Sequence, residues 1–136
     1  MNILYPIFAL IALTLSAGAR LGYLRYRAVI RKQVDATFYQ AYIGDEPLEL
    51  RVVSRHLINL LEMPILFYIA CLVAFVTGQS GSIALLLAWT YVSLRIIHTF
   101  IHLGLNIVIW RFRVFALSVL VLAALWTVLF LGLITR

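Results

Sequence analysis

The sequence has few charged residues, only five acidic residues and a single cysteine. Charged residues make up 12% of the 136-residue chain, and hydrophobic residues make up 65%. A soluble domain is about half apolar and about a quarter charged, so this shortage of charge indicates an integral membrane protein. A single cysteine excludes a disulfide within the chain, and we expect Cys71, which lies inside an apolar run, to be a buried structural thiol.

Four apolar stretches are long enough to cross a bilayer. A spanning helix needs about 20 mostly apolar residues, and the chain has room for four such helices but not for a separate soluble domain. We therefore predict an all-α integral membrane protein, a bundle of four transmembrane helices that forms a single domain over residues 1–136. The predicted spans are approximately residues 3–24, 51–77, 82–110 and 114–134.

Three polar connections separate these spans. Residues 25–50 contain a basic run followed by four acidic residues, and Gly44-Asp45-Glu46-Pro47 is typical of a turn. The second connection is residues 78–81, and the third is the basic stretch Arg111-Phe112-Arg113. Because the first apolar stretch has its basic residues after it and none before it, we expect a retained span rather than a cleaved leader.

Lysine and arginine are unevenly distributed between the two sides of the predicted bundle. The first and third connections, with their flanks, hold nearly all of them. The positive-inside rule therefore predicts that these connections are cytoplasmic and that both termini lie outside. We expect the protein to lie in a bacterial inner membrane. The net charge of +6 on this face indicates attraction to anionic lipid or an anionic ligand, and no nucleic-acid partner is expected.

Polar residues interrupt the second apolar stretch along one helical face. At about 100° per residue, Arg55, Asn59 and Glu62 lie within about 60° of one another, whereas His56 points about 100° away from Arg55 and is left out of this set. A charged group at the centre of a bilayer costs at least ~2.5 kcal/mol, so these residues are candidates for function. Pro64 follows directly, and its missing N–H predicts a bend in the helix.

The third stretch carries a second set of polar residues. Arg95, His98, His102 and Asn106 recur at spacings of three and four residues, so they too share one helical face. Counting inward from residue 110, we expect His98 at the depth of Glu62 and Arg95 slightly deeper.

The two sets have a structural and a functional interpretation. They could hold the helices together, with His102 level with Asn59 and with Glu62 neutralising Arg95. One carboxylate cannot neutralise all the arginines, however, and an excess of cationic donors favours an anionic ligand whose oxygen atoms bind guanidinium groups. The carboxylate of Glu62 suits a ligand that also carries an ammonium group.

Two histidines of the third stretch have the spacing of a metal site. His98 and His102 are four residues apart, which is a spacing used by zinc ligands. No H-E-x-x-H motif and no third ligand accompanies them in the sequence, so the sequence predicts no metal.

The pattern R-x3-N-x2-E-x-P over residues 55–64, on the second of four spans, resembles the signature of the MAPEG family. These are the membrane-associated proteins in eicosanoid and glutathione metabolism. The pattern R-x2-H-x3-H over residues 95–102, followed by Arg111 and Arg113 before the last span, is also similar to that family. The resemblance covers essentially the whole chain.

The resemblance implies a homotrimer that binds glutathione as a co-substrate between neighbouring subunits, near the cytoplasmic face. It implies that Arg111 or Arg113 stabilises the thiolate, with the spacing favouring Arg111, and that the histidines take positions where other members often have tyrosines. The residues that it implies for glutathione binding are Arg25 or Arg27 of the first helix, together with Arg55, Asn59, Glu62, Arg95, His98 and His102.

The expected function is that of a membrane-bound glutathione transferase or peroxidase-like protein that conjugates or reduces a hydrophobic small molecule. A free thiol has a pKa near ~8.5 and its thiolate is the nucleophile, so a guanidinium in a pocket of low dielectric would raise the thiolate population. Two alternatives stay open. One is a small four-helix multidrug-type transporter, although the first span lacks the carboxylate expected of it, and the other is a catalytically silent MAPEG-like subunit.

Overall fold

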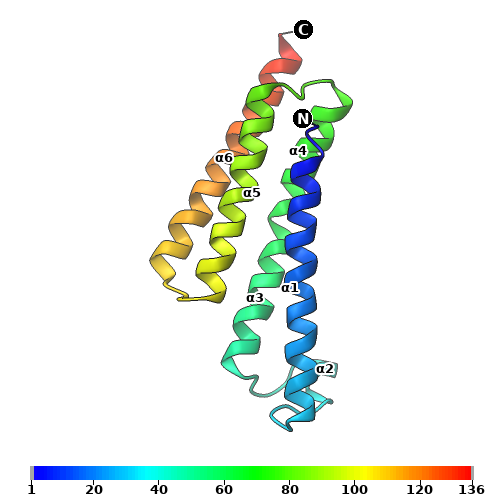
Figure 1. Cartoon of the computed structure of the whole chain (residues 1–136), viewed down its shortest axis with the longest axis vertical. Coiled ribbons are helices and arrows are strands. Elements are labelled where there is room, and N and C mark those ends of the chain that lie inside the picture. Colours follow the sequence, from blue (N-terminus) through cyan, green and yellow to red (C-terminus); the bar gives the residue numbers. More distant parts are fainter. Residues whose placement is uncertain (1, 136) are drawn as a thin grey trace.

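Four long helices make up most of the computed structural model, which describes residues 2–135 (Figure 1). All four are long and apolar enough to cross a bilayer, and no strand occurs in the described part of the chain, so the predicted all-α architecture is confirmed. The second span consists of two helices, and a single helical turn, α2, lies in the first connection. The helices are α1 (Tyr5–Ile30), α2 (Phe38–Ala41), α3 (Leu48–Glu62), α4 (Pro64–Val76), α5 (Ser82–Leu103) and α6 (Val108–Ile134).

The second span is interrupted where the sequence predicted it, between α3 and α4. Pro64 is the first residue of α4, and Met63 separates it from the end of α3 at Glu62. Proline has no N–H, so the carbonyl group of Leu60 receives no hydrogen bond from the residue four positions later. The interruption lies directly after Glu62, at the middle of the combined span Leu48–Val76.

The third connection lies earlier in the chain than predicted. α5 ends at Leu103 and α6 begins at Val108, so Arg111-Phe112-Arg113 lies on α6 and not in a turn. Asn106 makes the turn with a φ of 49°, in the left-handed region that asparagine adopts more readily than most residues. The prediction was wrong because the end of a membrane helix can be as rich in arginine as a loop, so composition alone does not distinguish the two.

The helices run alternately up and down the bundle. Both chain ends and the connection between α4 and α5 lie at one end of the molecule in Figure 1, and the connection that contains α2 lies at the other. α1 packs along α3, and α5 and α6 form a hairpin. The connection between α5 and α6 faces the same side as the first connection, as the predicted alternation of spans requires.

Two apolar clusters hold the bundle together. In the larger, Phe67 of α4 stacks on Tyr91 of α5 with ring centroids 4.6 Å apart, and the buried thiol of Cys71 packs in the same cluster, as expected. In the smaller, Leu21 of α1 packs with Val53 of α3. The second half of α3 therefore lies between the two clusters, and there His56 and Asn59 contact α5.

Candidate functional site

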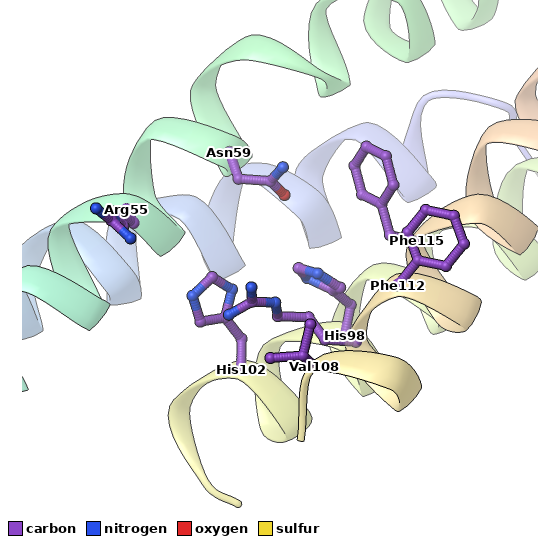
Figure 2. Close-up of a pocket in the computed structure, with 8 residues that line it drawn as sticks. Arg55, Asn59, His98, His102, Val108, Phe112 and Phe115 are labelled. Carbon is purple, nitrogen blue, oxygen red and sulfur yellow. The ribbon is translucent and has the colours of Figure 1, made fainter. Parts of the chain in front are cut away.

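A cavity of about 340 Å³ opens between α3, α5 and α6 (Figure 2). Its volume is at the lower end of the range of ~300–1,000 Å³ that is usual for small-molecule sites. Two of its eight described lining residues are arginines, and none of the eight is acidic. They are Arg55 and Asn59 of α3, His98 and His102 of α5, and Val108, Arg111, Phe112 and Phe115 of α6.

The two arginines of the cavity come from different helices. Arg55 is on α3 and Arg111 is on α6, so the cavity has a cation on each of two walls. Phe112 and Phe115 give it an apolar side, as Figure 2 shows. A concave site lined by charge of one sign concentrates ligands of the opposite sign, so this cavity favours an anion with an apolar part.

Arg95 lies behind the cavity wall and not in it. Its side chain is fully buried, and its Nη2 donates hydrogen bonds to the backbone carbonyl of Asn59 at 3.1 Å and to the side-chain oxygen of the same residue. The guanidinium carbon also lies 5.7 Å from the centre of the Phe115 ring. Asn59, not Glu62, is thus the hydrogen-bond partner of Arg95, and the pairing with Glu62 that the structural interpretation allowed does not occur within the described chain.

The register between α3 and α5 differs from the predicted one. His102 was expected level with Asn59, but Arg95 occupies that level and His102 lies beside His56, with ring centroids 5.0 Å apart. The prediction counted inward from residue 110, whereas α5 ends at Leu103. Counting from Leu103 brings Arg95 opposite Asn59 only if the count on the second span still starts at residue 51, whereas α3 begins at Leu48. The positions of the helix ends alone therefore do not determine the register.

His56, which the helical-angle argument left out, is fully buried and faces α5. Its ring centroid lies 6.0 Å from that of His98, and the centroids of His98 and His102 are 5.5 Å apart. A signal for this position was present in the sequence, because His56 continues the buried stripe of Val53 and Leu60 at spacings of three and four residues.

The structure separates the two arginines proposed for the thiolate. Arg111 lines the cavity, and its Nη1 donates a hydrogen bond of 2.8 Å to the side-chain oxygen of Asn106. Arg113 is exposed, and its guanidinium carbon lies 5.2 Å from the centre of the Trp110 ring. Two residues along a helix point to nearly opposite sides, so only Arg111 faces this cavity.

Three other predicted ligand residues lie away from the cavity within a single chain. Arg25 donates a hydrogen bond of 3.3 Å to the hydroxyl of Ser54, and its guanidinium lies over the ring of Tyr39. Arg27 is exposed in the last turn of α1. Glu62 is exposed on α3 and is not among the residues that line the cavity.

Comparison with known proteins gives one match. Residues 3–131 match the sequence model of the MAPEG family. No curated protein and no solved structure matches the chain. The matched range includes every residue that lines the cavity, from Arg55 to Phe115.

Proposed function

The chain belongs to the MAPEG family, and we propose that it is a membrane-bound transferase for glutathione or a similar small anionic thiol. Membership supports a membrane protein related to glutathione metabolism, and it favours neither the multidrug-type transporter nor the silent subunit. The observation that carries the proposal is the cavity itself, which Arg55 and Arg111 both line without an acidic residue among the described lining.

The thiol's carboxylates and amide groups would bind along α3 and α5. The guanidinium of Arg55 can donate two parallel hydrogen bonds to a carboxylate. Asn59 has its side-chain oxygen held by Arg95, so it offers the cavity the N–H groups of its amide, which are donors for ligand oxygen atoms. His98 and His102 offer further ring nitrogens on the opposite wall.

Arg111 is the group proposed to activate the sulfur. A guanidinium inside a cavity of low dielectric stabilises a neighbouring thiolate and lowers the pKa of the bound thiol. The thiol proton leaves to water, and the thiolate attacks an electrophilic carbon of the second substrate. A C–S bond forms, while the electron pair of the broken bond departs with the leaving group. Phe112 and Phe115 would contact this hydrophobic substrate.

The position of Glu62 supports the proposal that several copies of the chain form an oligomer. It is an exposed carboxylate at the middle of an apolar span, where contact with lipid would cost several kcal/mol. We propose a homotrimer, as the family resemblance implies, in which α3 faces a second copy. The carboxylate of Glu62 would then complete a neighbour's cavity and bind the ammonium group of its ligand.

The proposed orientation places the cavity on the cytoplasmic side of the membrane. The basic residues of the first connection and the start of α6 lie on this side of the bundle, and both ends of the chain lie on the other. A topology reporter fused after Arg136 should be active outside the cytoplasm only. Activity of that reporter in the cytoplasm alone would contradict the orientation.

A titration of the purified protein with glutathione tests the function. Thiolate formation is followed by its ultraviolet absorbance, and binding is followed separately by calorimetry. Arg111→Ala should keep most of the binding and lose most of the thiolate, because its proposed partner is the sulfur. Arg113→Ala is the matched control, since it removes the same side chain two residues away and outside the cavity.

Two results would contradict the proposal. One is a wild-type protein that binds neither glutathione nor a related anionic thiol. The other is an equal loss of thiolate in Arg111→Ala and Arg113→Ala, because it would show that the cavity arginine has no special role.

A further inference from the structure

All three histidines of the chain meet in one buried cluster, His56 on α3 with His98 and His102 on α5. The side chains are between 0% and 7% exposed. Both ring nitrogens of His56, and the Nδ1 atoms of His98 and His102, have no hydrogen-bond partner among the described residues. Buried polar atoms are nearly always satisfied by a partner, so four unpartnered ring nitrogens at one place indicate a missing ligand.

We propose that these three histidines form a site for a divalent transition metal of the Zn²⁺ class. One nitrogen from each of the three rings lies within 4.8 Å of the others. Zn–N bonds of ~2.0–2.1 Å in a tetrahedral site place the nitrogens about 3.4 Å apart, so modest side-chain rotations would close the cluster around an ion. His98 and His102 are one helical turn apart on one face, a spacing that zinc sites use, and His56 supplies the third ligand from α3.

The open position of this site faces the cavity. His98 and His102 line the cavity, whereas His56 lies behind them, so a fourth ligand would come from the cavity side. Three protein ligands with one open position are typical of catalytic zinc sites and not of structural ones. This arrangement would give a bound molecule direct access to the metal.

The surrounding charge restricts what the fourth ligand can be. Arg111 lines the same cavity and the buried Arg95 lies on the same face of α5, so a dication here adds to positive charge already present. An anionic ligand offsets that repulsion, which favours hydroxide or a thiolate over neutral water. The thiolate assignment depends on the proposed function, but the three-histidine site does not.

Cobalt(II) is a suitable probe, because its tetrahedral complexes absorb visible light strongly. Untagged protein is stripped with a chelator and titrated with Co²⁺, and Zn²⁺ is then added in competition. We expect about one Co²⁺ per chain, a tetrahedral spectrum and displacement by Zn²⁺. His56→Gln should weaken binding by more than the ~10- to 100-fold that loss of an outer-shell partner costs.

Cys71→Ala is the control, because Cys71 is the one thiol of the chain and should not contribute. His102→Gln tests the same loss from α5 if His56→Gln does not assemble. A wild-type protein that binds Co²⁺ no more tightly than either histidine variant, or that binds it without a tetrahedral spectrum, would overturn the metal site. Thiol binding to the metal-stripped protein is measured in parallel, so failure of this inference and failure of the proposed function give different results.

Discussion

The buried guanidinium of Arg95 on α5 donates hydrogen bonds to two oxygen atoms of a single residue, Asn59 on α3. No ion pair involves Arg95 among the described residues, so the partners of this cation are two amide oxygens and the ring of Phe115. The contact joins two helices and fixes the side chain of Asn59, which is part of the cavity wall. One arginine outside the cavity therefore determines which atoms the cavity presents to a ligand.

Asn59→Ala should lower the free energy of unfolding by roughly 1.5–3 kcal/mol, because it leaves the buried cation with the backbone carbonyl as its one remaining hydrogen-bond acceptor among the described residues. The same substitution in an Arg95→Met background should cost much less, since no charge is then left unsatisfied. Unfolding in detergent, measured for the four proteins of this double-mutant cycle, gives the coupling directly. Additive effects would show that the two residues do not depend on one another.

Arg55→Ala should leave an assembled protein that binds glutathione about ten- to a hundredfold more weakly, because one charge-assisted hydrogen bond to a carboxylate is worth roughly 1.5–3 kcal/mol. Arg51→Ala is the matched control. Arg51 lies one turn earlier on α3, is paired with Asp45 at 3.9 Å and does not line the cavity. Calorimetry on both variants provides the comparison. The ligand role of Arg55 fails if its loss changes neither thiol binding, thermal stability nor oligomeric state.

Glu62→Gln should weaken binding of glutathione but not of an analogue that lacks the ammonium group, because the proposed contact is between the carboxylate and that cation. A difference of about tenfold between the two ligands corresponds to about 1.4 kcal/mol. Native mass measurement and crosslinking in mild detergent should show three copies. Monomers alone would contradict the assembly, and equal losses for both ligands would contradict the role of Glu62.

The pKa of Asp35, in the first connection, is lowered by hydrogen bonds that its carboxylate accepts from the side chain and the backbone N–H of Thr37. A pKa that is lower in the folded protein contributes stability above the unfolded value, and this contribution is lost as the pH falls through the folded value. Thr37→Val removes the hydroxyl donor, so the pKa of Asp35 should rise toward its ordinary range. An NMR titration of the carboxyl carbon measures the change, and an unchanged midpoint would contradict it.

The sequence predicted the four spans, the interruption at Pro64 and the buried Cys71, because each follows from local composition or backbone chemistry. It also selected Arg55, Asn59, His98, His102 and Arg111, all of which line one cavity. The end of the third span was not predicted correctly. A helix that projects beyond the apolar core carries arginines as a loop does, so the basic residues were read as the turn. The signal for the true helix end was Gly104 with Asn106, because glycine and asparagine are common just after the end of a helix.

His56 was missed for a different reason. Its angle was measured from Arg55, which is exposed, and so His56 was left out of the set of candidate residues. Which face of α3 is buried depends on where the neighbouring helices pack, and His56 lies on the face that contacts α5. The burial of Val53 and Leu60 around it shows that the apolar stripe was the better reference.

The two walls of the cavity belong to different helix pairs, since α1 packs with α3 whereas α5 packs with α6. Apolar helices gain little by associating within lipid, so the junction between the pairs depends on close packing and on polar contacts such as that of Arg95. A thiol bound across this junction would contact both pairs of helices and so stabilise their association. At a hundred times its Kd it would add about 2.7 kcal/mol to their stability. Detergent extraction in the presence of the thiol should therefore recover more intact protein than extraction without it.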